Sequence, residues 1–201
     1  MKASDFNLST DLKYDFEKGM TTFKDARLVI FDSNAIGLLR ESIIKELGME
    51  KARKLFLRFG YQHGYADCMQ MKINYEFDNE IELLATGPTI HSWEGIVKAT
   101  PLAMPEFDRE KGTFLFKGTW TNSYEAEQHL SSREASKDPV CWTLMGYASG
   151  YGTAFFGSPV IAIEQACVGM GNDHCEWWIQ PPSVWGNKAV PYLEALKDLT
   201  A

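Results

Sequence analysis

The sequence predicts an α+β fold in which an antiparallel sheet packs against helices and encloses a buried ligand pocket. Two adjacent segments within residues 26–73 place apolar residues at helical spacing. Residues 113–121 alternate between large apolar and other side chains, and residues 159–180 contain two strand-like runs around a glycine-rich loop. With 201 residues, the chain is long enough for one domain with a substantial core.

Composition and charge narrow the classes of function. The net charge is -7 at pH 7 and the pI is about 5.1, whereas binding to nucleic-acid phosphates needs clustered Lys and Arg. No apolar run approaches the roughly 20 residues of a spanning helix, and the polar first ten residues contain no signal-peptide core. We therefore expect a cytoplasmic protein without membrane contact, whose cysteines are metal ligands or core residues rather than disulfides.

The two ends of the chain differ from its middle. Residues 1–27 are polar with scattered aromatic side chains, and we expect an N-terminal arm that makes a dimer contact. Residues 181–187 begin with two prolines and predict a break, and residues 188–199 predict a short amphipathic helix. We interpret residues 181–201 as the start of a linker, so that residues 28–180 form the body of the domain.

Helical spacing predicts two consecutive helices, over residues 26–48 and 49–73, the first of which ends at Gly48. Gly60 and Gly64, four residues apart in the second helix, favour the close approach of another helix at a cost in helix propensity. The expected inner face of the second helix consists of Leu55, Phe59, Gln62, Ala66 and Met69.

From Ile81 onward the pattern favours strands. Gly87-Pro88 predicts a turn. Residues 90–99 and 113–121 predict a pair of strands separated by a polar loop. Residues 123–134 are polar and predict a connector or a short helix.

The last third of the chain predicts a helix followed by a strand pair. Asp138-Pro139 is typical of a helix start, with Asp138 as the N-cap and Pro139 in the first turn. That helix would carry Cys141, Tyr147 and Tyr151. Residues 159–166 and 175–180 then predict two strands.

Cysteines in the last third of the chain predict a metal site. They are Cys141, Cys167 and Cys175. Thiolates are the usual ligands of structural zinc, which takes four donors, and the glycine-rich loop can bring two of them together. Spacing alone leaves the fourth ligand open between Glu164, Asp173 and His174, and also leaves open that these thiols are merely buried core residues. Cys68 stands alone in a helical segment, and we expect it to be a core thiol.

A second constellation indicates a pocket for a flat apolar ligand. Phe116, Gly118 and Trp120 share one face of the predicted strand with Phe114. The gap at Gly118 suits either the floor of an aromatic-ring site or a bulge. His91 and the Trp120 indole N–H could bind a ligand hydroxyl, although a lone histidine is more often a satisfied core or surface residue.

Motifs of common enzymes do not occur in the chain. It contains no phosphate-binding loop, nucleophile elbow, His-Glu-x-x-His sequence or complete dinucleotide fingerprint. Its carboxylates form no convincing acid/base pair. We therefore expect that this chain is not an enzyme.

At this point the chain resembles a known family, the aromatic-sensing domains of sigma-54-dependent transcription activators of the NtrC class. The resemblance runs from about residue 28 to 186, and its zinc segment also resembles the broader vinyl-4-reductase-type domain. It is carried, in order, by Phe56-Leu-Arg-Phe-Gly-Tyr-Gln, Gly87-Pro-x-x-His91, Trp120-Thr-Asn-Ser-Tyr124, the run from Asp138 to Tyr151, and Glu164-x-x-Cys167-x-Gly-x-Gly-x-Asp-x-Cys175.

This resemblance implies site residues by position. A structural zinc ion would be held by Cys141, Glu164, Cys167 and Cys175, which decides the fourth ligand against His174. In the family's phenol sensors, the residues at the positions of His91 and Trp120 bind the phenol hydroxyl. The other expected ligand-binding residues are Trp93, Phe116, Gly118, Tyr147, Tyr151 and Ala162. Gly118 and Ala162 are smaller, and Trp93 larger, than many family counterparts, so a substituted or larger phenol is expected.

The resemblance also implies partners that this chain does not contain. In full-length family members an ATPase domain and a DNA-binding helix-turn-helix follow the sensor, which acts in a homodimer together with sigma-54 RNA polymerase. Effector binding would relieve repression of that ATPase. The main alternative is a stand-alone vinyl-4-reductase-type module that binds a tetrapyrrole or a lipid; a zinc enzyme and a purely structural dimerisation module are weaker alternatives.

Overall fold

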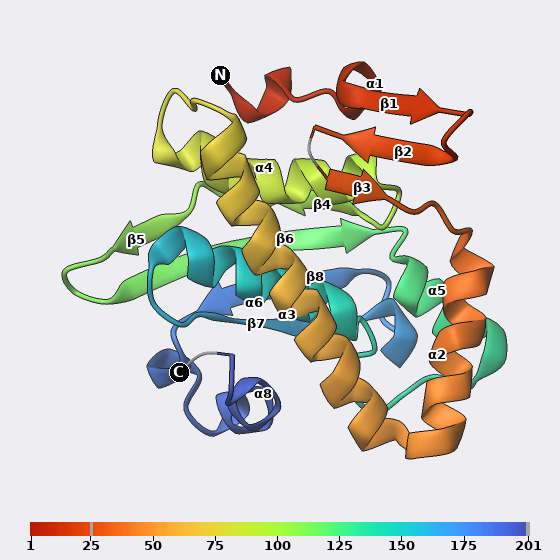
Figure 1. Cartoon of the computed structure of the whole chain (residues 1–201). Coiled ribbons are helices and arrows are strands. Elements are labelled where there is room, and N and C mark those ends of the chain that lie inside the picture. Colours follow the sequence, from red (N-terminus) through yellow and green to blue (C-terminus); the bar gives the residue numbers. More distant parts are fainter. Residues whose placement is uncertain (25, 200–201) are drawn as a thin grey trace.

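Figure 1 presents the computed structural model of the chain, which describes residues 1–24 and 26–199. Asp25 of the expected arm and residues 200–201 of the expected linker lie outside the described residues. The predicted combination of helices and antiparallel sheet is confirmed. Helix α6 (Trp142–Phe156) is the central element, because it packs between the long helix α3 (Met49–Asn74) and the main sheet.

The N-terminal arm folds back on its own chain. Phe6 is buried and contacts the rings of Phe23 and Tyr75 edge-on, and the amino group of Met1 lies 2.9 Å from the Asp78 carboxylate. A contact with a second subunit stays a prediction. The elements of the arm are η1 (Ala3–Asp5), α1 (Leu8–Asp11) and a small antiparallel sheet of β1 (Leu12–Asp15), β2 (Met20–Phe23) and β3 (Ala26–Leu28).

The first predicted helix begins later than residue 26. Residues 26–28 form β3, and helix α2 spans Ser33–Leu47. The start is fixed by Asp32, whose side chain accepts a hydrogen bond from the Ala35 N–H at 2.9 Å. The predicted end at Gly48 is confirmed, with a positive φ of 80° that favours glycine.

The predicted inner face of α3 is wrong. Leu55, Phe59 and Met69 are exposed, and the face turned to α6 instead carries Leu57, Gly60, Tyr61, Gly64 and Cys68. Glycine decides the orientation, since a Cβ atom on Gly60 would lie 2.1 Å from the Thr143 carbonyl oxygen of α6. The close helix approach expected from Gly60 and Gly64 is therefore confirmed, while side-chain hydrophobicity indicated the wrong face.

Residues 80–93 form a helix, not the predicted strand and turn. Helix α4 (Glu80–Trp93) begins at Asn79, whose side chain accepts from the Glu82 N–H, and it continues through Pro88. After the proline, the Thr89 hydroxyl donates to the Ala85 carbonyl, and the Ser92 hydroxyl donates to the Pro88 carbonyl. The cap and these bonds outweigh the loss of one backbone hydrogen bond at proline.

The main sheet is antiparallel throughout, with the order β4-β6-β8-β7 and β5 attached to β6 among the described residues. Its register places Gly118 opposite Trp177 and Trp120 opposite Cys175. The predicted pairing of 159–166 with 175–180 is confirmed, as is that of 113–121 with the end of 90–99. The strands are β4 (Lys98–Pro101), β5 (Glu106–Asp108), β6 (Thr113–Thr121), β7 (Ile161–Ala166) and β8 (Cys175–Gln180).

Helix α6 begins three residues later than predicted, and Asp138 is not its cap. The N-cap position is Cys141, and the first free N–H groups, those of Thr143 and Leu144, donate to the Glu125 carboxylate at 3.1 Å each. Glu125 belongs to helix α5 (Tyr124–Ser132), so of the two predictions for residues 123–134, a connector or a short helix, the helix is confirmed. A buried carboxylate from another element thus replaces the local cap.

The described part of residues 181–201 packs against the domain. Trp185 is buried and donates to the Ile161 carbonyl at 2.8 Å, and Arg58 of α3 donates to the Ala195 carbonyl at 2.9 Å. Its elements are α7 (Pro182–Trp185), η3 (Gly186–Ala189) and α8 (Val190–Leu196). The role as a linker stays a prediction. None of the described helices has the length and apolar character needed to span a membrane.

Candidate metal centre and ligand cavity

Four side chains predicted to bind zinc converge at the start of α6. The Cys141 sulfur lies 3.9 Å from the sulfurs of both Cys167 and Cys175, and the ligand atoms of all four residues, including Glu164, lie within 4.8 Å of one another. All four are buried. A tetrahedral zinc ion with Zn–S bonds of ~2.3 Å separates its sulfurs by roughly 3.8 Å, so the arrangement could hold a metal ion.

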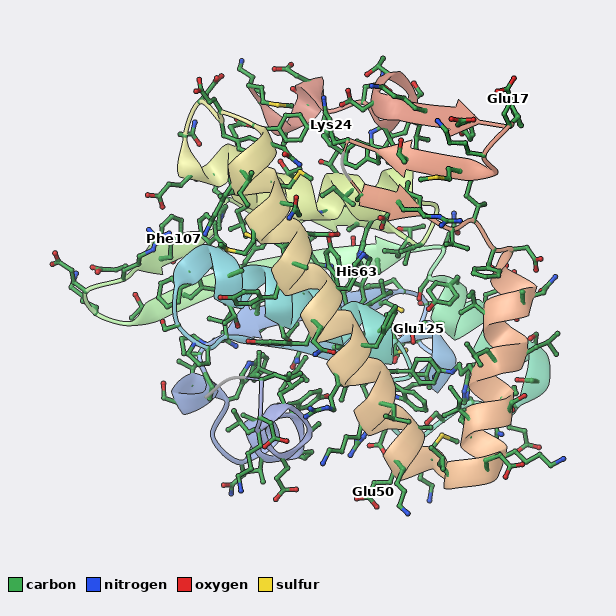
Figure 2. The ribbon with its side chains drawn as sticks, viewed as in Figure 1. Glu17, Lys24, Glu50, His63, Phe107 and Glu125 are labelled. Atoms are coloured by element: carbon green, nitrogen blue, oxygen red, sulfur yellow. The ribbon has the colours of Figure 1, made fainter. Side chains whose placement is uncertain are left out.

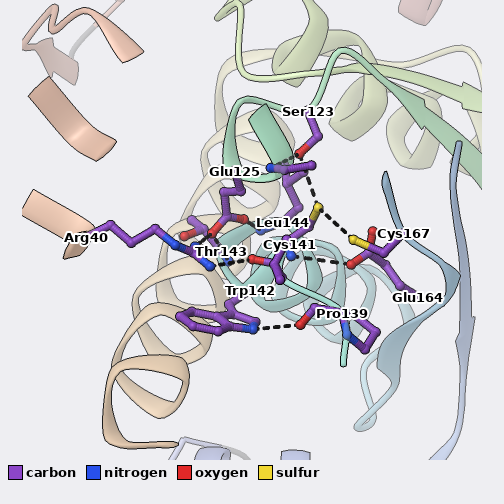
Figure 3. A network of polar contacts seen from close by, with 12 residues as sticks. Arg40, Ser123, Glu125, Pro139, Cys141, Trp142, Thr143, Leu144, Glu164 and Cys167 are labelled. Carbon is purple, nitrogen blue, oxygen red and sulfur yellow. Dashed lines mark hydrogen bonds and ion pairs between the residues drawn. The ribbon is translucent and has the colours of Figure 1, made fainter. Parts of the chain in front are cut away.

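The loop between β7 and β8 is shaped to present these donors. The 3-10 helix η2 (Val168–Met170) follows Cys167, and the Val168 N–H donates to the Cys175 sulfur at 3.3 Å. The Cys167 N–H donates to the Asn172 side chain, and Ser123 lies 3.2 Å from the Cys141 sulfur (Figure 3). His174 and Asp173, the other candidates for the fourth ligand, are exposed and stand outside the cluster.

The pKa shifts of the four clustered side chains also favour a cation bound among them. Burial raises the pKa of Cys141 and of Glu164 well above their ordinary values, whereas hydrogen bonds from Cys141 and Cys175 lower the pKa of Cys167. Glu164 Oε1 is buried and has no hydrogen-bond partner among the described residues. A divalent metal ion would compensate the buried anionic donors and occupy this unpaired oxygen, so the donor set fits a closed, structural zinc site.

A cavity lies beside α6, between α4 and the strands β4, β6 and β8. The centre of a water molecule can move through about 30 Å³ inside it. Five of the predicted ligand-binding residues line it: His91, Phe116, Trp120, Tyr147 and Tyr151. The fold thus brings predicted residues from α4, β6 and α6 together in one place. The remaining lining residues are Leu84, Gly87, Pro88, Ala99, Ala148, Gly152, Trp177 and Ile179.

Three other predicted ligand-binding residues do not line the cavity. Trp93 ends helix α4 and is 43% exposed, because residues 81–93 are helical and turn its ring toward solvent. Gly118 faces the Trp177 ring, which fills the space that was expected to receive a ligand. Ala162 is buried in β7, where its N–H donates to Ser149 of α6.

Trp177 is one of the cavity residues that sequence reasoning missed, and it carries a buried donor. Its side chain is 2% exposed, and its indole Nε1 is buried without a hydrogen-bond partner among the described residues. The alternation of residues 175–180 was a usable signal, since Cys175, Trp177 and Ile179 share the buried face of β8.

His91 is held in its neutral form. Complete burial, with a smaller effect of nearby His63, lowers the pKa of His91 to about 3. Its ring lies against that of Tyr147, with centroids 3.7 Å apart. A neutral imidazole offers one donor and one acceptor nitrogen, which matches the hydrogen-bonding capacity of a hydroxyl group.

Tyrosine side chains form the fixed part of the cavity wall. Tyr151 donates to the Leu83 carbonyl at 2.8 Å, and Tyr147 donates to the Asp67 carboxylate at 2.9 Å. His63 of α3, labelled in Figure 2, lies 3.5 Å from the same Asp67 oxygen. The ligand atoms of His63, Asp67 and Glu94 lie within 4.8 Å of one another, so Tyr147 connects the cavity to a polar cluster nearer the surface.

Comparison with known proteins agrees with this arrangement. The profile of the family described as activator of aromatic catabolism matches residues 7–108, which are 102 of the 201 residues. The chain belongs to this family. The profile of the vinyl-4-reductase-type domain matches residues 120–181, the segment that contains all four predicted zinc ligands.

Curated relatives of the family are regulators. The chain is 33% identical over 182 residues to the phenol regulator MopR of Acinetobacter guillouiae and 32% identical over 181 residues to the transcriptional regulatory protein XylR of Pseudomonas putida. Each match covers 90% of this chain and 32% of the relative, so the chain spans about a third of the length of these proteins.

Among solved structures, the chain is similar to the phenol-responsive sensory domain of the transcription activator PoxR, determined with phenol. The TM-score is 0.87 at 30% sequence identity, and the match covers 96% of this chain and 94% of the other. The fold described here is thus shared with that domain over nearly its whole length.

Proposed function

We propose that this chain is the aromatic-effector sensing domain of a sigma-54-dependent transcription activator and that it binds a phenolic or related aromatic compound. The observation that carries the proposal is the cavity beside α6, which joins aromatic walls to the neutral His91. The family membership and the likeness to a phenol-responsive domain support it.

Ring burial supplies most of the binding free energy in this proposal. Removing ~150–250 Å² of apolar ligand surface from water at ~25 cal/mol per Å² contributes on the order of 4–6 kcal/mol before the costs of association. The walls that receive the ring are Phe116, Tyr151 and Ile179. This contribution does not distinguish phenol from toluene.

Selectivity for a hydroxyl group comes from His91 and Trp120. No hydrogen bond involves either ring among the described residues, so both have free bonding capacity at the cavity. A phenol hydroxyl would donate to His91 and accept from the Trp120 indole N–H, whereas a methyl group would leave both groups unsatisfied. His91 and Trp120 act as binding residues, and we assign no catalytic role.

Entry of a ring requires side chains to move. A single water needs ~10–15 Å³ of the space in which its centre can lie, so the 30 Å³ present is smaller than an aromatic ring needs. Tyr147 and Tyr151 are anchored by hydrogen bonds. We therefore expect His91 and Trp120, which are not anchored in this way, to move when an effector binds.

Zinc has a structural role in the proposal. Cys141, Glu164, Cys167 and Cys175 would hold it, and with four protein donors it has no open position for substrate. The ion would link the loop between β7 and β8 to Cys141, the residue that precedes α6. Because Tyr147 and Tyr151 lie on the same helix, the site would also fix one wall of the cavity.

Regulation would follow from a difference in effector affinity between two states. The relatives are about three times longer than this chain, and we propose that an ATPase domain and a DNA-binding domain follow it in a homodimeric activator. Residues 181–199 pack on α3 and β7 and would transmit a change in α3 or α6 toward those domains.

Calorimetric titration of the zinc-loaded chain tests the proposal. The ligands are phenol, a methylphenol, a biphenylol and toluene, and the variants are His91→Ala and, as a matched control, the exposed His174→Ala. We expect phenols to bind wild type and His174→Ala, with at least tenfold weaker binding to His91→Ala. Binding of toluene and phenols alike, unchanged in His91→Ala, would contradict hydroxyl recognition.

The match to the vinyl-4-reductase-type domain supports one alternative, a stand-alone module for a tetrapyrrole or a lipid. That alternative predicts that a pigment or lipid co-purifies with the protein and that no aromatic compound in the panel releases heat. The match of residues 7–108 to the aromatic-activator family counts against it.

A further inference from the structure

The indole of Trp177 is the second buried donor on the cavity wall. It lies between Phe116, at 5.1 Å between ring centroids, and Trp120, at 6.0 Å. The side chain is 2% exposed, and Nε1 has no hydrogen-bond partner among the described residues. Buried polar groups in folded proteins are nearly always hydrogen-bonded, so an unpaired donor on a cavity wall points to a bound acceptor.

Gly118 is what brings this indole into the cavity. The two residues are paired across β6 and β8. A Cβ atom on Gly118 would lie 2.1 Å from Trp177 Cζ2 and 2.6 Å from Cε2, closer than any side chain could approach. Glycine at 118 and tryptophan at 177 are therefore a matched pair, and the pair adds an N–H donor to the wall where a larger residue at 118 would exclude it.

The donor of Trp177 is positioned apart from that of Trp120. The two indole planes are tilted by 32°, and their centroids are 6.0 Å apart. An N–H group points outward in the plane of its own ring, so two rings that are tilted and separated favour two acceptor atoms over one shared atom. A single phenol hydroxyl that binds His91 and Trp120 would then leave Trp177 unpaired.

We propose that Trp177 Nε1–H forms a second oxygen subsite and that the effector is an aromatic ring with two oxygen substituents. One is a hydroxyl group bound by His91 and Trp120, and the other is an acceptor such as a methoxy, hydroxyl or carbonyl oxygen bound by Trp177. This inference rests on the proposed function, since it places the second subsite in the same cavity.

Pairs of ligands that differ only in the acceptor oxygen test the subsite. Calorimetry would compare 2-, 3- and 4-methoxyphenol with the ethylphenol of the same substitution pattern, on zinc-loaded wild type and on Trp177→Phe, which keeps an aromatic ring but removes the N–H. We expect at least one methoxyphenol to bind wild type about 5- to 100-fold more tightly than its ethyl counterpart. In Trp177→Phe this difference should fall to within twofold, because both ligands lose the same ring contacts and only the methoxyphenol loses a hydrogen bond.

A direct readout keeps the subsite testable if Trp177→Phe does not fold. In wild type labelled at the indole nitrogens, one N–H resonance that shows contacts to the Phe116 ring should move downfield with the methoxyphenol and not with the ethylphenol. The subsite would be overturned if wild type bound each methoxyphenol and its ethylphenol counterpart equally, or if wild type and Trp177→Phe showed the same difference in affinity between them. Either result would leave the proposed function intact. If no phenol binds wild type, the proposed function fails and the subsite fails with it.

Discussion

The guanidinium group of Arg40 lies 2.7 Å from the carboxylate of Glu125, and the side chains are only 3% and 1% exposed (Figure 3). The Arg40 group also donates to the Val140 carbonyl at 2.8 Å and stacks on the Trp142 ring at 3.9 Å. Since Glu125 accepts from the first N–H groups of α6, this pair fixes the start of the helix that carries both Cys141 and the cavity tyrosines.

Replacement of Arg40 should therefore destabilise the whole domain. In Arg40→Met the Glu125 charge stays buried without its partner, and we expect the free energy of unfolding to fall by about 3–5 kcal/mol in denaturant titrations. The matched control is Arg133→Met, whose ion pair with Glu41 has the same 2.7 Å separation but exposed fractions of 32% and 28%. That pair should contribute less than ~1 kcal/mol. Equal effects of the two substitutions would contradict the central role of Arg40.

Replacement of one of the four proposed zinc ligands should abolish zinc binding and loosen the loop between β7 and β8. Cys175→Ser replaces a buried thiolate donor, so we expect less than one zinc ion per chain by elemental analysis, and a lower unfolding temperature that added zinc does not restore. Cys68→Ala is the control, because Cys68 is equally buried but lies on α3 outside the cluster. A Cys175→Ser protein with full zinc content would show that the four residues are not the ligands.

The contact between α3 and α6 should not tolerate a methyl group. In Gly60→Ala the new Cβ would meet the Thr143 carbonyl oxygen at 2.1 Å, and both sides of the contact are backbone, so neither can rotate away. We expect a loss of about 3 kcal/mol or more in stability. Gly87→Ala is the matched control, since its Cβ would meet only the Tyr151 ring at 3.2 Å, and a side chain can adjust. A stable Gly60→Ala protein would mean that the helices lie further apart.

The sequence contained the glycine signal for this contact but not the orientation of the helix. Gly60 and Gly64 predict a close helix contact because two glycines four residues apart are visible in the sequence without knowledge of the second helix. The orientation was not readable, because large apolar residues lie on both faces of the helix: Leu55 and Phe59 are exposed, whereas Leu57 is buried. When two helices meet through backbone, small residues mark the interface, because large apolar residues also occur on the outer face.

The remaining errors share a physical cause, which is that the deciding partner is distant in sequence. The pattern from Ile81 onward predicts strands with a turn at Gly87-Pro88, but the Asn79 cap and tertiary packing hold a helix through the proline. The cap of α6 is Glu125 rather than the adjacent Asp138. Spacing alone left the fourth metal ligand open and the family resemblance chose Glu164; in the structure Glu164, and not His174, lies beside the three thiols.

Acidification should reveal the buried neutral state of His91. Its pKa is about 3 in the folded protein against 6.5 for the free side chain, so folding favours the neutral form. The stability contributed by this preference is complete above pH 6.5 and is lost as the pH falls from 6.5 toward 3, because only the unfolded chain takes up the proton. From these two pKa values we expect the free energy of unfolding to fall by about 2 kcal/mol between pH 7.5 and 5.

Urea unfolding of wild type and His91→Gln across this range would measure the loss. Glutamine cannot be protonated, and the contributions of the other titrating groups cancel when the free energies of unfolding of the two proteins are subtracted. Parallel curves for wild type and His91→Gln would mean that His91 is accessible to protons in the folded domain.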